Sequence, residues 1–153
     1  MGAYFLDSSA LVKRYASETG TAWMLSLFRH GASHALYAVR ITRVETTAAL
    51  VRKRRGSHLT PDAAAKALQR LRRDFGRRFY IVEVTPALLQ YAETLAEKHG
   101  LRGYDAVQLA AAIEANAERA RVNLLPLVLV AADNALLAAG TAEGLATDNP
   151  NTH

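Results

Sequence analysis

The sequence predicts an α/β fold, a three-layer α/β/α sandwich with a mostly parallel central sheet, formed by one domain over residues 1–153. Three observations favour this fold. Short apolar segments of strand length alternate along the chain with longer segments of helical periodicity. The segment 126–130 is almost wholly apolar, which is typical of a central strand of a parallel sheet. No internal repeat, linker or low-complexity segment interrupts the alternation.

Strands are expected where apolar or β-branched residues form a short run that ends at a polar residue or a turn. The first run stops at an acid, and the two serines after it can cap the helix that follows. The four expected strands are Ala3–Leu6, His34–Val39, Phe79–Val84 and Pro126–Val130.

Helices are expected between these strands, since apolar residues there recur at helical spacing. Pro61 and Pro86 stand at first helical positions, where the missing amide of proline costs little, and Gly56 and Gly100 follow helix ends. The two helices on either side of Gly56 are expected to form a hairpin. The expected helices lie around Leu11–Tyr15 and Trp23–Phe28, from Thr42 to about Arg55, from Pro61 to about Phe75, from Pro86 to near Gly100, from Gly103 through Ile113, and after Asn134.

The composition narrows the possible chemistry and location of the protein. The chain has no cysteine, which excludes disulfides, thiolate zinc sites and a cysteine nucleophile. Its longest apolar runs fall short of the roughly 20 residues that span a bilayer. The first eleven residues lack the basic start of a signal peptide. We therefore expect a cytoplasmic protein that does not associate with membranes.

Positive charge is concentrated in one part of the sequence. The formal net charge is +5, and ten of the nineteen Lys and Arg residues lie within 52–78. This stretch predicts either two solvated helix faces or a surface that contacts the phosphate backbone of a nucleic acid. On the second interpretation, the candidate RNA contacts are Arg52, Lys53, Arg54, Arg55, Arg72 and Arg73.

Four acidic residues occupy positions that a parallel sheet would bring to one edge. Asp7 and Asp133 each follow an apolar strand, and such strands can be neighbours with their carboxyl ends side by side. Asp105 and Glu45 each lie in the first turn of a helix that a parallel crossover would place near that edge. The alternative is that each acid merely caps its own helix, with Glu45 in a capping box with Thr42.

Convergence of these acids would require a cation. Two carboxylates about 4 Å apart repel by about 4 kcal/mol at an effective dielectric constant near 20. That exceeds the roughly 0.3–1 kcal/mol that a charge gains at a helix end. Oxygen ligands without cysteine or paired histidines favour Mg²⁺ or Mn²⁺ over zinc. Water activated by such an ion can attack a phosphodiester, and Ser9 is expected to orient Asp7 or that water.

These residues stand in a recognisable pattern: Asp-Ser-Ser-Ala-Leu-Val-Lys-Arg-Tyr at 7–15, Glu45 in Thr-Arg-Val-Glu, Asp105 in Tyr-Asp-Ala-Val-Gln-Leu-Ala, and Asp133 before a short helix that ends in Ala-Glu-Gly-Leu. In this pattern the chain resembles the PIN-domain family, and within it the VapC-type ribonuclease toxins of type II toxin–antitoxin systems. The likeness extends over nearly the whole chain, to the tail at 148–151.

The resemblance implies a small α/β domain, often a homodimer, which binds Mg²⁺ or Mn²⁺ and hydrolyses RNA, with an antitoxin chain covering the site. Asp7 and Asp105 would bind the ion, Glu45 would bind it or position the attacking water, and Asp133 would complete the negative pocket. Ser9 matches a small polar residue of the family. Relatives commonly have Thr or Ser two residues before the last acid, where this chain has Ala131. Asp133 could therefore be a direct ligand, an outer ligand or a support for Ser9.

Two other classes of function remain open at this point. One is a non-catalytic RNA-binding or protein-interaction module on the same fold. The other is a receiver-like or phosphoryl-transfer domain, which would need an acidic pair directly after one strand and a lysine at the end of another, and neither is evident. The five histidines are scattered and fit no general-base role.

Overall fold

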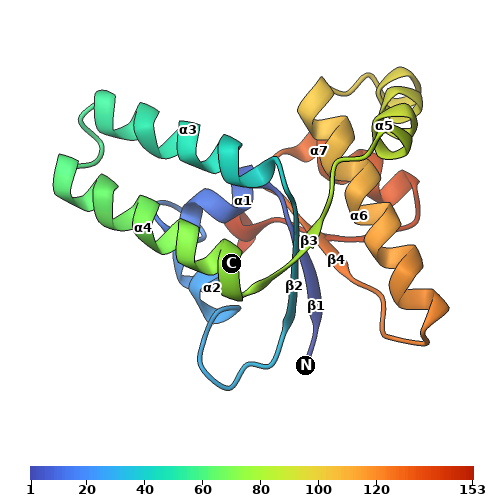
Figure 1. Cartoon of the computed structure of the whole chain (residues 1–153), viewed down its shortest axis with the longest axis horizontal. Coiled ribbons are helices and arrows are strands. Elements are labelled where there is room, and N and C mark those ends of the chain that lie inside the picture. Colours follow the sequence, from blue (N-terminus) through green and yellow to red (C-terminus); the bar gives the residue numbers. More distant parts are fainter.

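A computed structural model describes all 153 residues as a three-layer α/β/α sandwich around a parallel sheet (Figure 1), which confirms the predicted fold class. The sheet has five strands in the order β3-β2-β1-β4-β5, and every neighbouring pair is parallel. The strands are β1 Ala3–Leu6, β2 Ala35–Val39, β3 Phe79–Val82, β4 Val128–Val130 and β5 Ala146–Asp148.

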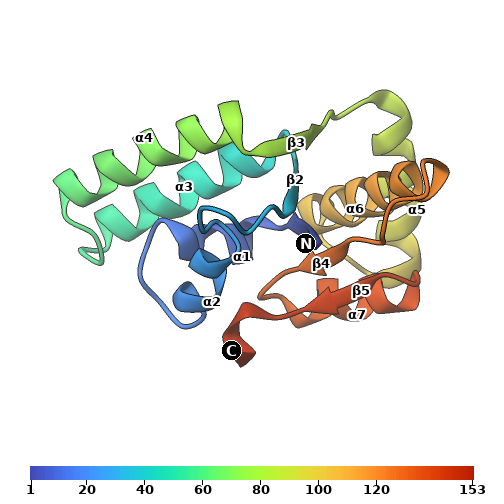
Figure 2. The same cartoon turned by 90° about the horizontal axis from the view of Figure 1, so that it is seen from below.

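Helices cover both faces of the sheet. They are α1 Ser8–Leu11, α2 Thr21–Ser26, α3 Thr42–Arg55, α4 Pro61–Arg77, α5 Pro86–His99, α6 Gly103–Arg121 and α7 Asn134–Ala142, with short 3₁₀ turns at Val12–Arg14 and Pro150–Thr152. Figure 2 shows α1–α4 on one side of the sheet and α5–α7 on the other. Neighbouring strand residues face opposite layers, so Phe5 belongs to the apolar core under α5–α7 and Leu6 to the core under α1–α4. No helix in the structure is both long enough and apolar enough to cross a membrane.

All the predicted elements are present, but some have different bounds. The strand expected over Phe79–Val84 ends at Val82, and the strand expected over Pro126–Val130 begins at Val128. The helix expected around Leu11–Tyr15 is α1, followed by the 3₁₀ turn at Val12–Arg14. The predicted hairpin is present, because α3 and α4 pack side by side (Figure 1), although α4 continues to Arg77. The strand β5 was not expected. Its three residues, Ala146–Asp148, are too few and too polar to show a strand periodicity, and they are held as a strand by pairing with β4.

Two helical glycines provide a test of the packing. A Cβ atom added at Gly140 in α7 would lie 2.7 Å from Leu129 Cδ2, whereas one added at Gly76 in α4 would meet nothing within 4 Å. We expect Gly140→Ala to lower the free energy of unfolding by about 1–3 kcal/mol through overpacking. We expect Gly76→Ala to raise it by about 0.4–1 kcal/mol, because alanine loses less chain entropy on folding. Urea unfolding of the two variants checks this pair, and equal effects would contradict the described packing of α7.

The order of the strands decides where the acidic residues lie. Asp7 directly follows β1, and Asp133 follows β4, the neighbour of β1 on one side. Glu45 lies in the first turn of α3, just after β2, the neighbour of β1 on the other side. The carboxyl edge of the sheet at β2, β1 and β4 therefore carries three of the four acids.

Candidate functional site

Asp7 is the most buried of the four acids, with 3% of its surface exposed. Its backbone N–H donates to the carbonyl of Val130 at 3.0 Å, which fixes the end of β1 against β4. Its side chain also caps α1, because Oδ2 accepts the backbone N–H of Ser9 at 3.0 Å. The capping interpretation thus describes one oxygen of Asp7. Oδ1 is left as the oxygen available to a cation.

Ser9 links the ends of two neighbouring strands. Its Oγ donates a hydrogen bond to Asp7 Oδ2, and Ser9 Oγ also accepts a hydrogen bond from the backbone N–H of Ala132 at 2.9 Å. Ala131, the position without a hydroxyl group, is fully buried next to this contact. Ser9 therefore holds Asp7 against the segment that leads from β4 to Asp133.

Glu45 does not form the capping box that was the alternative for it. Helix α3 begins after Ile41 without any side-chain cap, so Thr42 lies inside the helix instead of at its cap. The carboxylate of Glu45 instead accepts hydrogen bonds from two side chains of other elements. Gln108 Nε2 donates to Oε1 at 2.7 Å, and Ser8 Oγ donates to Oε2 at 3.3 Å. These contacts turn Glu45 toward Asp7 and α6.

Gln108 is a residue of this site that the sequence prediction missed. It is fully buried in α6, and it also pairs with the buried hydroxyl of Thr42 at 2.9 Å. A signal was present, because Gln108 is the one polar residue in the apolar run 106–113 and lies three residues after Asp105, on the same helix face. A fully buried amide of this kind needs partners in the fold.

The other two acids are more accessible to solvent. Asp105, in the first turn of α6, is half-buried and has no hydrogen-bond partner in the chain. Asp133 caps α7, because its Oδ1 accepts the backbone N–H of Leu136 at 3.0 Å. Asp133 therefore caps its helix with one oxygen, as Asp7 does, whereas Asp105 caps no helix.

The acids influence one another's ionisation. Burial raises the pKa of Asp7, hydrogen bonds from Ser9 partly offset this, and the charge of Asp133 raises it further. Burial also raises the pKa of Glu45, and the charges of Asp7 and Asp105 raise it further, whereas the hydrogen bond from Gln108 lowers it. For Asp105, burial and then the charges of Asp7 and Asp133 raise the pKa. All four carboxylates therefore contribute to one negative site.

The donor set of this site suits a hard divalent cation. All the donors are carboxylate or hydroxyl oxygens, the ligands that Mg²⁺ and Mn²⁺ prefer. A cation would favour the ionised carboxylates, whose pKa values are raised mainly by burial and further by repulsion among the acids. No group of three or more His, Asp and Glu side chains lies close enough together to hold an ion as the side chains are placed. The residues fit the cation by their chemistry, and binding would require their side chains to close around it.

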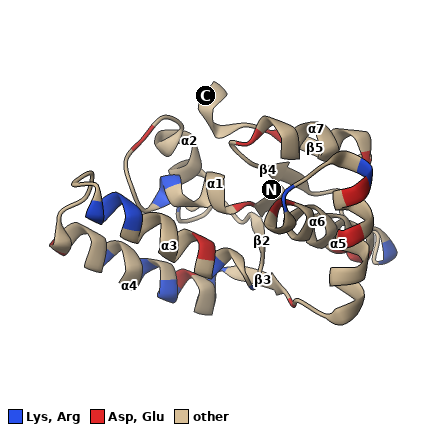
Figure 3. Ribbon diagram, turned by 90° about the horizontal axis from the view of Figure 1, so that it is seen from above, with Lys and Arg blue, Asp and Glu red and all other residues tan.

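The candidate RNA-contacting residues lie apart from the carboxylates. Arg52, Arg54 and Arg55 are exposed in the last turn of α3, about 10–15 Å along that helix from Glu45 at 1.5 Å per residue. Lys53 is paired with Glu18 at 2.8 Å. Arg72 and Arg73 are exposed on α4, and Figure 3 shows the basic residues spread over the α3–α4 hairpin. The structure does not bring these residues into contact with the acidic site.

Gln108→Leu tests the support of Glu45. Leucine has a similar volume but cannot donate to Glu45 or pair with Thr42, so the buried Thr42 hydroxyl and the half-buried Glu45 carboxylate each lose a partner. We expect the free energy of unfolding to fall by about 1–3 kcal/mol. We also expect the pKa of Glu45 to rise further, because the hydrogen bond from Gln108 lowers it. Carbon-detected NMR titration of the Glu45 carboxyl measures this pKa, and an unchanged value would contradict the described contact.

Comparison with known proteins gives both sequence and fold relatives. The family model of the PIN domain matches residues 4–140. The protein named Ribonuclease VapC45 from Mycobacterium tuberculosis is 38% identical over 113 residues, which are 74% of this chain and 76% of that protein.

Solved structures that share the fold include the following two. One is PAE2754 from Pyrobaculum aerophilum, with a TM-score of 0.64, 22% identity, and coverage of 99% of this chain and 91% of the other. The second is a chain of a toxin-antitoxin complex from Klebsiella pneumoniae, with a TM-score of 0.58, 15% identity, and coverage of 96% and 97%.

Proposed function

Because the chain belongs to the PIN domain family, we propose that it is an endoribonuclease of the VapC type, the toxin of a type II toxin–antitoxin pair, which cuts RNA at the carboxylate site with Mg²⁺ or Mn²⁺. The observation that carries the proposal is that four carboxylates from separate parts of the chain lie at the carboxyl edge of the sheet and at the start of α6, where burial, with added repulsion from neighbouring carboxylates, raises the pKa values of Asp7, Glu45 and Asp105. The similarity to Ribonuclease VapC45 of Mycobacterium tuberculosis supports the reaction class.

Each site residue has a role that its contacts support. Asp7 would hold the cation through Oδ1 while Ser9 fixes its other oxygen. Asp105, which has no partner in the chain, would be the second ligand. Asp133 would complete the negative pocket, either as a ligand or, since Ser9 contacts the adjacent Ala132, as a support for Ser9.

Glu45 is the residue best placed to act on the attacking water. Gln108 and Ser8 orient its two oxygens, and burial raises its pKa toward the range in which a carboxylate accepts a proton effectively at neutral pH. A divalent cation bound at the site would acidify a bound water and neutralise charge on the phosphate. The alternative role for Glu45 is as a third ligand.

The products follow from attack by water. A water that displaces the 3′-oxygen leaves a 5′-phosphate and a 3′-hydroxyl, and the RNA 2′-hydroxyl takes no part. The purified protein should cut RNA from a panel of structured and single-stranded substrates in Mg²⁺ and not in chelator, and should also cut a substrate that carries 2′-O-methyl groups. Products with 2′,3′-cyclic phosphate ends would contradict this reaction.

The partners of the proposed toxin are RNA, an antitoxin chain that covers the carboxylates, and a second copy of the chain in a homodimer. An antitoxin partner is supported by the shared fold with a chain of the toxin-antitoxin complex from Klebsiella pneumoniae. The alternative function is a non-catalytic RNA-binding or protein-interaction module. It differs from the nuclease in what it predicts for variants of the acids and of the basic run. In that case Asp7→Asn and Asp105→Asn would leave every activity unchanged, and charge reversal at Arg52–Arg55 would abolish binding.

A further inference from the structure

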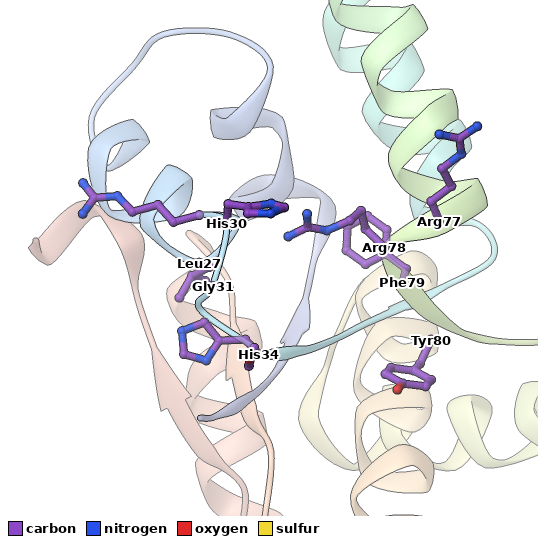
Figure 4. A pocket seen from close by; sticks show the side chains of 10 residues that line it. Leu27, His30, Gly31, His34, Arg77, Arg78, Phe79 and Tyr80 are labelled. Atoms are coloured by element: carbon purple, nitrogen blue, oxygen red, sulfur yellow. The ribbon is translucent and has the colours of Figure 1, made fainter.

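A polar hollow lies at the edge of the sheet opposite to the carboxylates. Its volume is about 500 Å³, and it opens between the segment 27–34, which leads into β2, and the segment 77–80, which joins α4 to β3 (Figure 4). The segment 27–34 precedes β2, and the segment 77–80 runs from the end of α4 into the first two residues of β3. The hollow therefore lies at the amino edge of the sheet, while Asp7 and Asp133 lie at the carboxyl edge. The polar and aromatic side chains of its lining that matter here are Arg29, His30, His34, Arg77, Arg78 and Tyr80.

The lining of this hollow is basic and contains no acid. Three arginines and two histidines line it, and none of the three arginines forms an ion pair anywhere in the chain. The nearby carboxylate of Asp74 is already engaged by Arg14 at 2.7 Å and by the Tyr15 hydroxyl at 2.8 Å. The positive charge of the hollow is therefore not neutralised within the protein, which favours an anionic ligand.

Arg78 is held in position inside the hollow. Its Nη2 donates to the carbonyl of Phe28 at 3.2 Å, and its guanidinium carbon lies 5.8 Å from the centre of the Phe28 ring. Figure 4 shows the guanidinium facing the ring of His30, which comes from the opposite wall and has no hydrogen-bond partner, whereas Arg77 points away from them. The remaining N–H groups of Arg78 are thus available, and a guanidinium already oriented by a hydrogen bond loses less entropy when it binds a phosphate.

Two further features extend the site beyond one phosphate. Tyr80 is 62% exposed, and its ring is stacked on Tyr37 with centroids 5.1 Å apart, so its free face offers a platform on which a base can stack. Arg70, Arg73 and Arg77 follow one another at i, i+3 and i+7 on the exposed face of α4, which ends at the hollow. A row of exposed arginines on α4 therefore leads to the rim of the hollow.

We propose that the hollow binds a nucleotide of a single-stranded RNA, with its phosphate on Arg78 and His30, at a site separate from the carboxylates. The phosphate chemistry follows from the lining, and the choice of RNA rests on the proposed ribonuclease function. The row of arginines on α4 favours a strand over a free nucleotide, because successive phosphates of a strand would meet successive arginines.

The test is RNA binding without cleavage. A fluorescein-labelled 12-nucleotide single-stranded RNA is titrated with the protein in chelator at several salt concentrations, with adenosine monophosphate as the free-nucleotide arm. Arg78→Gln should weaken binding about tenfold, since hydrogen bonds from a charged guanidinium to phosphate are about twice as strong as neutral ones. It should also reduce the slope of log affinity against log salt by about 0.7. The matched control is Arg121→Gln, an exposed arginine of α6 outside the hollow with the same loss of charge.

His30→Ala is the second variant, because His30 is exposed and unbonded, and its removal should not disturb folding. It should weaken binding severalfold. Equal affinities for Arg78→Gln, His30→Ala and Arg121→Gln would overturn the proposal. Binding of adenosine monophosphate as tight as that of the RNA, and equally dependent on Arg78, would overturn the assignment to a strand. The binding assay is done in chelator and does not depend on cleavage. In a separate cleavage assay, activity retained by Asp7→Asn would refute the proposed function but would not change the binding result.

Discussion

Asp7→Asn is expected to reduce RNA cleavage by well over 100-fold while the protein remains folded. Loss of a group that merely orients a metal ligand typically costs about 10- to 100-fold, and Asp7 is proposed as a ligand itself. Asparagine keeps the size of the side chain and can still accept hydrogen bonds from Ser9, so the loss would come from the missing charge. Initial cleavage rates in Mg²⁺, measured for both proteins from the same purification, check this expectation.

The same substitution should stabilise the protein in the absence of a cation. Burial raises the pKa of Asp7, so the ionised carboxylate costs free energy in the folded state that a neutral amide avoids. The gain should be on the order of 1 kcal/mol, as is common when a functional site is relieved of strain or charge. Asp62→Asn, which changes an exposed acid paired only with Lys66, is the matched control and should alter neither activity nor stability measurably. An Asp7→Asn protein that cleaves like the wild type would remove the main support for the enzyme.

Mg²⁺ is expected to raise the melting temperature at pH 7.5 and to have little effect at pH 4. The pKa values of Asp7, Glu45 and Asp105 are raised in the folded protein. At pH values between the ordinary carboxyl pKa of about 4 and these raised pKa values, the folded state binds more protons than the unfolded chain. The stability contributed by these groups therefore falls as pH rises through that window. A cation binds the ionised carboxylates and restores the stability that is lost at high pH.

The magnitude of this effect follows from mass action. At a concentration of 100 times its dissociation constant, a ligand of the folded state adds about 2.7 kcal/mol. For a chain of this size that corresponds to roughly 5–10 °C. Glu18 and Glu143 have lowered pKa values and act on stability in the opposite direction, so the quantity to compare is the difference between Mg²⁺ and chelator at each pH. A difference that is the same at pH 4 and pH 7.5, or that persists in Asp7→Asn, would contradict cation binding by these carboxylates.

The placement of the acids could be predicted because it depends on topology. An acid after an apolar run marks the carboxyl end of a strand, and parallel neighbours share that edge, so Asp7 and Asp133 could be assigned to one place from sequence. The role of Glu45 could not be separated from helix capping in this way. Its sequence context fits a capping box with Thr42, and only the fold, which brings α1 and α6 to the start of α3, shows that Ser8 and Gln108 are its partners.

Features that depend on long-range packing could not be predicted from the sequence. The strand β5 has too few residues to show a period and exists through pairing with β4. The basic hollow joins the segments 27–34 and 77–80, whose charges look like ordinary solvated residues until the fold brings them together. The basic run at 52–55 is conspicuous in the sequence, but the fold does not place it at the acidic site. Lys53 is paired with Glu18, and the run lies at the opposite end of α3 from Glu45.

The most direct test of the central claim is to measure Mn²⁺ binding and RNA cleavage in one titration. Electron paramagnetic resonance reports free Mn²⁺ while samples of the same solution are assayed for product. The account predicts that occupancy and cleavage rise with the same midpoint in the wild type, and that both are lost in Asp7→Asn and weakened in Asp105→Asn. Cleavage that proceeds before any Mn²⁺ is bound, or Mn²⁺ binding that is undiminished in Asp7→Asn, would contradict the assignment of these carboxylates as the site of reaction.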